Sequence, residues 1–212
     1  MTTTLVHLVR HGEVFNPEKI LYGRIPGYKL SERGQAMADL VAEYFADADL
    51  THLVSSPLER AMQTAAPIGR VKNLPISQDL NLLEATNVFE GKRVSFSDGE
   101  LRKPSAWRHL WNPFRPSWGE PYREIFARMQ IAVESARVAA LGHEAVLVSH
   151  QLPIWVARLG YQNHSFVHNP SHRECNLASV TTLKFHNDQL ANVSYLEPAA
   201  ALYKESTGGV GA

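Results

Sequence analysis

The segment Leu5–Glu13 constrains the fold of this chain more than any other. Residues 5–9, Leu-Val-His-Leu-Val, are mostly apolar and β-branched, a pattern that favours a buried β-strand. Arg10, His11 and Gly12 then end the apolar run. An unpaired charge is costly inside a core, but polar groups at the carboxyl end of a strand are typical of ligand sites in open α/β sheets. The segment therefore predicts a strand that delivers an arginine and a histidine to the edge of a sheet.

Strand-like and helix-like segments alternate along the rest of the chain. The expected strands cover residues 52–56, 75–80 and 145–149 and a hairpin of 177–185 with 190–196. The expected helices cover residues 31–45 with Ser31 as N-cap, 58–68, 120–141, and a segment opened by Pro153. Because parallel strands need helical crossovers, this alternation predicts an α/β fold with parallel strands.

The composition indicates one domain with a conventional core. The chain has 212 residues, and Lys+Arg 21 equals Asp+Glu 21, so no overall field draws in nucleic acid or a membrane. We expect a single domain over residues 1–197 and a loose tail over 198–212. The single Cys175, with no signal-like or membrane-spanning apolar run, favours the cytoplasm.

Three predicted strands end in residues suited to anion binding. His11 ends the first, His150 ends the strand at 145–149, and Ser56 ends a third that leads to Arg60 one helical turn later. In an open α/β sheet such ends meet at one edge. Arginine pairs with two oxygens at once, and histidine can attack phosphorus. The pattern predicts a site for a tetrahedral dianion.

Several motifs share the order of a known family. They are Leu8–Glu13, Tyr22–Arg24, Leu30–Gly34, Ser55–Ala65, Gly119–Glu120 and Val148–His150. Together, over residues 5 to about 160, they resemble the histidine phosphatase superfamily, which includes cofactor-dependent phosphoglycerate mutases and broad-specificity acid phosphatases. The resemblance implies a phosphoglycerate mutase-like three-layer sandwich, with a mostly parallel central sheet flanked by helices.

The resemblance also implies a role for each residue of the site. His11 would be the phosphorylated nucleophile, while Arg10, Arg60 and His150 would bind the phosphoryl group and stabilise its charge. Glu84 would donate a proton to the leaving oxygen and later help water to attack. Phosphoryl transfer depends mainly on positioning and charge stabilisation, so we expect no metal and no cofactor.

The proton donor and the outer phosphate ligands stay open. Glu84 precedes Glu90-Gly91 with a spacing unlike the commonest form in the family, so Glu90 and Glu13 are alternatives. The further phosphate-binding candidates are Asn16, one position early relative to the mutases, Arg24, and Gln151, where many relatives have glycine.

Residues 91–119 are rich in aromatic and basic side chains and lack a regular pattern. They represent either a solvated loop with a few anchoring aromatics or an insertion that covers the active site. An insertion of this composition suggests a substrate with a flat or anionic part beyond its phosphate.

Four other histidines have plainer interpretations. His164, His168 and His172 recur every four residues, as metal ligands on a helix do, but Pro170 interrupts that helix. We therefore favour a polar loop without a metal, and we expect His7, within the first strand, to be a core histidine with satisfied hydrogen bonds. Cys175 is expected to be a small buried residue and not a catalytic thiol.

These observations favour a metal-independent phosphomonoester hydrolase that acts on a small phosphorylated metabolite through a phosphohistidine. The alternative is a cofactor-dependent phosphoglycerate mutase. Residues 85–89, Ala-Thr-Asn-Val-Phe, lack the basic and hydroxyl groups that mutases carry after the acid, whereas Arg93, Arg102, Arg108 and Arg115 are available to hold phosphoglycerate. A third, less favoured function is non-catalytic binding of a phosphorylated ligand. The sequence sets neither the natural substrate nor the oligomeric state, for which a homodimer is one option.

Overall fold

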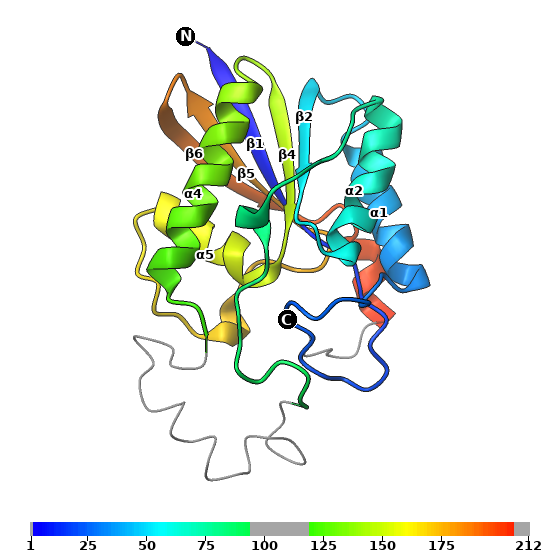
Figure 1. Cartoon of the computed structure of the whole chain (residues 1–212). Helices are drawn as coiled ribbons and strands as arrows, with labels where there is room; N and C mark the ends of the chain where they lie inside the picture. The colour runs from blue at the N-terminus through cyan, green and yellow to red at the C-terminus, as the bar shows by residue number, and fades with distance from the viewer. Residues whose placement is uncertain (1, 94–118, 206–212) are drawn as a thin grey trace.

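A six-stranded sheet forms the centre of the computed structural model, which describes residues 2–93 and 119–205 (Figure 1). Its strands are β1 (Thr3–Arg10), β2 (Leu50–Ser55), β3 (Ser77–Gln78), β4 (Glu144–Ser149), β5 (Val180–His186) and β6 (Gln189–Leu196). Within the described residues their spatial order is β3-β2-β4-β1-β5-β6. The first four strands run parallel to one another, and β5 and β6 run antiparallel. The prediction of a mostly parallel sheet is confirmed.

Helices cover both faces of this sheet (Figure 1). The helices are α1 (Glu32–Tyr44) and α2 (Glu59–Lys72) on one face, and α4 (Tyr122–Ala139) and α5 (Gln151–Tyr161) on the other, with short 3-10 turns η1 (Leu80–Leu82), η3 (Pro170–His172) and η4 (Ala200–Glu205). The predicted three-layer α/β sandwich is therefore confirmed. Within the described part of the chain, none of the helices is both long enough and apolar enough to cross a membrane.

The two halves of the core follow from alternation along the strands. Val6 and Leu8 of β1 join the cluster beneath α4 and α5, whereas Val9 joins the cluster beneath α1 and α2. Successive side chains of a strand point to opposite faces, so a continuous apolar strand is stabilised only between two helical layers. Each fully buried side chain of this size contributes about 1.5–3 kcal/mol through the hydrophobic effect.

Helix α2 continues four residues beyond its predicted end at residue 68. Pro67 and Gly69 disfavour a helix interior, yet both are buried there. Tertiary packing therefore overrides their low helix propensity. The helix ends where Asn73 adopts the left-handed conformation with φ of 52°.

The residues after β6 do not form the loose tail expected from Pro198 onward. Ala199 is buried in the core, residues 200–205 form η4, and the hydroxyl of Tyr203 donates to the carbonyl of Leu177 at 2.5 Å. Ala199, Leu202 and Tyr203 thus pack a segment whose composition suggested disorder against the core beneath α1 and α2. Residues 206–212 lie outside the described residues.

The sheet register assembles the candidate site. Arg10 at the end of β1 pairs with Ser149 at the end of β4, and Ser55 of β2 pairs with Val148. The residues that follow these three strand ends therefore meet at the edge seen at the lower centre of Figure 1. Those residues are His11, His150 and Ser56.

Candidate active site

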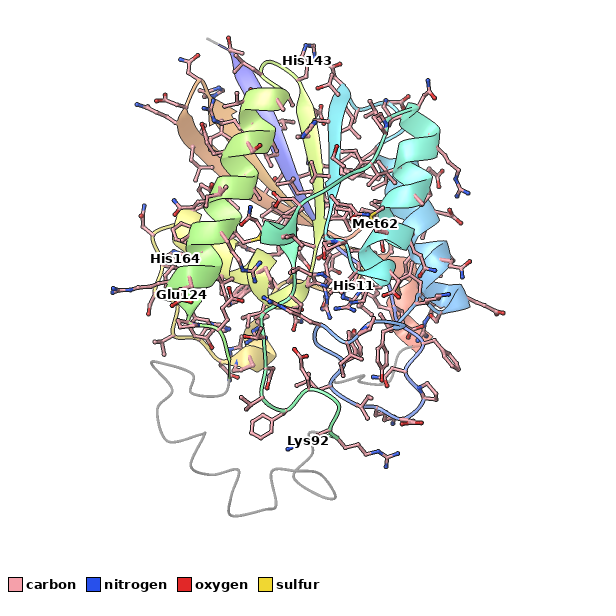
Figure 2. All side chains as sticks on the ribbon, in the orientation of Figure 1. His11, Met62, Lys92, Glu124, His143 and His164 are labelled. Atoms are coloured by element: carbon pink, nitrogen blue, oxygen red, sulfur yellow. The ribbon has the colours of Figure 1, made fainter. Side chains whose placement is uncertain are left out.

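His11 lies at this edge of the sheet with a fully buried imidazole (Figure 2). Its Nδ1–H donates to the carbonyl of Gly12 at 2.8 Å, because a carbonyl can only accept. A neutral imidazole has one N–H, so Nε2 carries the lone pair, and this atom has no partner within the described residues. Burial, and then the positive charges of Arg60 and Arg10, lower the pKa of His11 well below its usual value. At neutral pH the ring is a neutral nucleophile.

Arg10 and Arg60 are anchored by neutral carbonyl groups. Nη1 of Arg10 donates to the carbonyl of Cys175 at 2.7 Å, and Nη2 of Arg60 donates to that of Gly23 at 2.6 Å. The Arg60 guanidinium also lies 4.7 Å from the ring centroid of Tyr22. Buried N–H groups of both arginines have no partner in the described part of the chain. Two cations oriented in this way, without a carboxylate partner, are suited to hold an anion.

His150 faces His11, with ring centroids 5.1 Å apart. Its Nε2 lies 2.8 Å from the hydroxyl oxygen of Ser56, while its Nδ1 is buried without a partner in the described residues. Burial, followed by the charge of Arg60, lowers the pKa of His150 well below its usual value. When Ser56 donates its hydroxyl proton to Nε2, Nδ1 carries the ring proton, and His150 offers a neutral hydrogen-bond donor to the site.

Glu84 supplies a buried carboxyl group just after η1. Its Oε1 accepts a hydrogen bond from the backbone N–H of Ala85 at 2.9 Å, and its Oε2 has no partner within the described residues. Burial raises the pKa of Glu84, although the Ala85 hydrogen bond and the charge of Arg60 oppose this shift. A carboxyl group whose pKa is raised by burial holds its proton more firmly than an exposed one, as suits a general acid.

Unpartnered buried polar atoms are concentrated in this cluster. The described residues contain ten such atoms, and six of them belong to Arg10, His11, Arg60, Glu84 and His150. Leaving a buried donor or acceptor unsatisfied costs about 1–3 kcal/mol. Most buried polar groups in proteins are paired, so this concentration indicates a ligand site in which oxygens bind the donors.

Gly12 is required by the close packing of the site loop on α1. A Cβ at residue 12 would lie 2.5 Å from the carbonyl oxygen of Gly34, and one at residue 34 would meet the Glu13 carbonyl. The two glycines let the site loop rest directly on the first turn of α1. This contact requires glycine at both positions.

The alternatives to Glu84 differ in how they are bound. Arg33 and Ser31 both donate to the Glu13 carboxylate, and the hydrogen bond from Arg33 lowers its pKa. Glu13 is therefore a poor proton donor. Glu90 lies against Gly23, in the space that a side chain at residue 23 would fill, and one of its carboxylate oxygens is buried without a described partner. Glu90 thus stays the alternative to Glu84.

Two predicted phosphate ligands are engaged elsewhere. The Asn16 side chain donates to the carbonyl of Ile20 at 2.8 Å and accepts from the Ile20 N–H at 3.2 Å, so its amide closes its own loop. Nε of Arg24 donates to the backbone carbonyl of Glu84 at 2.5 Å, and its Nη2 donates to the Glu120 carboxylate at 3.1 Å. Arg24 therefore lies at the site and holds the backbone of Glu84. The Asn16 amide is occupied by Ile20 and is not available to a phosphate in this conformation.

Gln151, the last predicted ligand, leads to an arginine that the sequence interpretation missed. Its Nε2 lies 3.5 Å from the carbonyl of Cys175, and its Oε1 lies 3.5 Å from Nη1 of Arg173. Arg173 is half-buried in the loop before β5 and belongs to no recognised motif. Cys175 is buried as expected, and burial raises the pKa of its thiol to about 11.

The three evenly spaced histidines occupy a loop and the short turn η3. His168 uses both ring nitrogens, since Nδ1–H donates to the carbonyl of Phe166 at 2.7 Å and Nε2 accepts from Nε of Arg173 at 2.8 Å. Within the described residues, no group of three histidine, cysteine or acidic side chains could hold a metal ion.

Most of the basic insertion lies outside the described residues. Of the arginines considered for a mutase, Arg102, Arg108 and Arg115 fall in that part, and Arg93 is exposed. The two described flanks of the segment meet at an isolated antiparallel bridge between Asn87 and Gly119.

Comparison with known proteins defines the class. The chain belongs to the histidine phosphatase superfamily (branch 1), whose sequence model matches residues 6–197. It is 52% identical over 197 residues to Uncharacterized protein Rv0525 of Mycobacterium tuberculosis, covering 93% of this chain and 98% of that one. It is 30% identical over 196 residues to the probable phosphoglycerate mutase GpmB of Photorhabdus laumondii, covering 90% and 84% respectively.

Solved structures share the fold. Bacillus stearothermophilus YhfR superposes with a TM-score of 0.76 at 25% identity, covering 89% of this chain and 94% of that one. The mycobacterial glucosyl-3-phosphoglycerate phosphatase Rv2419c superposes with a TM-score of 0.70 at 24% identity, covering 87% and 91%.

Proposed function

We propose that this protein is a metal-independent phosphomonoester hydrolase that acts on a small phosphorylated metabolite through a phosphohistidine at His11. The observation that carries the proposal is that, among the described residues, Nε2 of His11 and several N–H groups of Arg10 and Arg60 have no hydrogen-bond partner. Membership of the histidine phosphatase superfamily supports chemistry at phosphorus.

In the first half of the reaction, Arg10, Arg60 and His150 bind the non-bridging oxygens of the phosphoryl group. Nε2 of His11 attacks phosphorus in line with the ester oxygen, and a nitrogen–phosphorus bond forms while the phosphorus–oxygen bond breaks. Glu84 transfers its proton to the leaving oxygen, and the alcohol is released. The Gly12 carbonyl, bound to Nδ1–H, stabilises the positive charge that develops on the ring.

In the second half, water attacks the phosphohistidine. Glu84, now a carboxylate, accepts a proton from this water as the oxygen–phosphorus bond forms and the nitrogen–phosphorus bond breaks. Inorganic phosphate leaves, and His11 and protonated Glu84 are restored. Every step uses side chains of this chain, with the arginines stabilising the charge of each transition state.

A cofactor-dependent phosphoglycerate mutase is the second candidate, and the relationship to GpmB favours it. Residues 85–89 argue for the hydrolase, because they lack basic groups and Asn87 is used locally, accepting a hydrogen bond from the Phe89 N–H at 3.0 Å. Assays of 3- to 2-phosphoglycerate conversion, with and without bisphosphoglycerate, separate the two. Robust cofactor-dependent isomerisation would replace the hydrolase assignment.

The decisive experiment traps the intermediate. The purified full chain is treated with chelator, assayed on p-nitrophenyl phosphate and a metabolite panel from acidic to neutral pH, and quenched in alkali, where phosphohistidine survives. We expect turnover and a phosphoprotein in the wild type, and neither in His11→Ala. Activity that persists in His11→Ala overturns the mechanism, and absence of any turnover favours a phospho-ligand-binding protein.

A further inference from the structure

Arg173 shares an unusual property with the two arginines of the phosphate site. Five arginines that are not exposed have a carboxylate partner: Arg24, Arg33, Arg128, Arg137 and Arg158. Within residues 2–93 and 119–205, Arg10, Arg60 and Arg173 are the arginines that are not exposed and have no such partner. Removing a cation from water without an anion is unfavourable, so such a residue indicates that the anion comes from elsewhere.

The guanidinium of Arg173 is oriented by its neighbours but not neutralised by them. Its Nε donates to Nε2 of His168 at 2.8 Å, and this nitrogen must be unprotonated because Nδ1–H of His168 donates to Phe166. Burial lowers the pKa of His168, and the Arg173 charge adds to this effect, so the ring stays a neutral acceptor. One N–H of Nη1 points to Gln151 at the long distance of 3.5 Å. The Nη2 group has no protein partner in the described part of the chain.

Arg173 lies next to the phosphate site, because Gln151 contacts both Arg173 and the Cys175 carbonyl that binds Arg10. Burial lowers its pKa and the charge of Arg10 adds to this effect, while Tyr122 and Glu84 raise it. Glu84 is the proposed donor to the leaving oxygen. Two residues further along the chain, the Cys175 carbonyl binds Arg10.

We propose that Arg173 binds a second anionic group of the substrate, an oxyanion carried by the alcohol that leaves. This inference rests on the proposed function, because Arg10 and Arg60 then hold the phosphoryl group and the neighbouring Arg173 meets the rest of the substrate. The preferred substrates are then phosphomonoesters whose alcohol bears a carboxylate or a second phosphate. The planar guanidinium suits either group, since both present paired oxygens. Arg173 thus determines specificity and takes no part in bond breaking.

Arg158 provides a matched control, because this arginine of α5 binds the loop that carries Arg173. Its Nη2 donates to the Glu174 carboxylate at 2.7 Å, next in sequence to Arg173, and its guanidinium lies over the rings of Trp155 and Tyr195. Replacing Arg158 disturbs the anchoring of this loop without removing the unpaired cation. A purely structural role for Arg173 predicts the same kinetic effect from both replacements.

The experiment compares Arg173→Gln, Arg173→Lys and Arg158→Gln with the wild type. The substrates are glycerol 3-phosphate, which has a neutral alcohol, 3-phosphoglycerate, which replaces that alcohol by a carboxylate, and propane-1,3-diol bisphosphate, which carries a second phosphate. We expect Arg173→Gln to raise KM for one or both anionic substrates roughly tenfold to a hundredfold, with kcat and the neutral substrate little changed. Arg173→Lys recovers part of the loss, and Arg158→Gln treats all substrates alike. If only 3-phosphoglycerate is affected, the group bound by Arg173 is a carboxylate, and if only the bisphosphate is affected, it is a phosphate.

An equal loss on neutral and anionic substrates in Arg173→Gln overturns the inference and leaves the hydrolase in place. Binding is read separately from the shift in melting temperature that each compound produces. If the wild type turns over nothing, the proposed function fails, and the inference is then decided by these shifts. A larger shift with 3-phosphoglycerate than with glycerol 3-phosphate, lost in Arg173→Gln, supports it, and equal shifts refute it.

Discussion

Two buried histidines of the same strand region, His7 and His11, have opposite environments. His7 lies within β1, where Nδ1 is 2.8 Å from the Thr182 hydroxyl and Nε2 is 2.9 Å from the Glu144 carboxylate. His11 lies just beyond β1, with Nδ1 bound to its neighbour's carbonyl and Nε2 without a described partner. Both rings are almost inaccessible to solvent. The prediction that His7 is a satisfied core histidine is confirmed.

The difference shows that burial alone does not identify a reactive residue. His7 has two partners, and its hydrogen bonds contribute to the stability of the fold. His11 keeps one nitrogen without a partner among the described residues, and burial, followed by the charges of Arg60 and Arg10, lowers its pKa. The unpartnered groups around His11 are costly to bury, as expected for a functional site.

The largest expected effect separates the two histidines by turnover. His11→Ala should lower kcat/KM on the order of 10⁴-fold or more, because it removes the atom that attacks phosphorus. His7→Gln, which retains side-chain hydrogen-bonding groups on the same strand, should keep most of the activity. Steady-state hydrolysis of p-nitrophenyl phosphate measures both. Similar losses in the two variants would erase the functional distinction.

Glu84→Gln should show the next largest effect, and this effect should depend on the leaving group. Alkyl phosphates need a proton on the leaving oxygen and should slow by about 10²–10⁴-fold, whereas p-nitrophenyl phosphate should slow much less. Glu90→Gln is the matched control, and a leaving-group-dependent loss in that variant instead would transfer the role to Glu90.

The pH profile of the wild type offers a second test of Glu84. Since Glu84 must be protonated in the free enzyme, kcat/KM for alkyl phosphates should fall as pH rises through its raised pKa. Glu84→Gln should remove this alkaline limb. A limb that is unchanged in the variant would assign the titration to another group.

Arg60→Lys should lower kcat/KM by about 10²–10³-fold, because lysine keeps the charge but loses the planar donors Nε and Nη1. Arg70→Lys, at an exposed ion pair with Asp39, is the matched control and should change nothing. Equal activity in wild type and Arg60→Lys would show that charge alone suffices.

The smallest effects concern stability, where the order of the two histidines reverses. His7→Gln should lower the free energy of unfolding in urea by about 1–3 kcal/mol. The glutamine amide cannot contact both Thr182 and Glu144 as the imidazole ring does, so a buried polar group loses its partner. His11→Ala should cost less, since it removes an unpaired nitrogen. A greater loss in His11→Ala would contradict the contrast.

The strand ends were predictable because their chemistry is local. An apolar run followed by Arg10-His11, or by Ser149-His150, places polar groups at the edge of an α/β sheet whatever the detailed packing. The α/β class, the mostly parallel sheet and the core position of His7 follow from such patterns. The extent of α2 and the course of residues 198–205 do not, because packing decided both.

The state of each site atom depended on contacts between distant parts of the sequence. Arg10 is held by a carbonyl 165 positions away, and His7 by a hydroxyl 175 positions away. Arg33 pairs with the Glu13 carboxylate, and the Asn16 amide hydrogen-bonds within its own loop. The identity of these two residues therefore did not show whether their side chains could bind a substrate. Arg173 carried no motif at all.

The sequence by itself determined which chemical groups this protein brings to one sheet edge, since strand periodicity and chain order set the register. The tertiary structure alone decided which of their nitrogens and oxygens remain unpaired. Hydrogen bonds form between segments far apart in the chain. Among the described residues they bind both nitrogens of His7 and leave Nε2 of His11 without a partner.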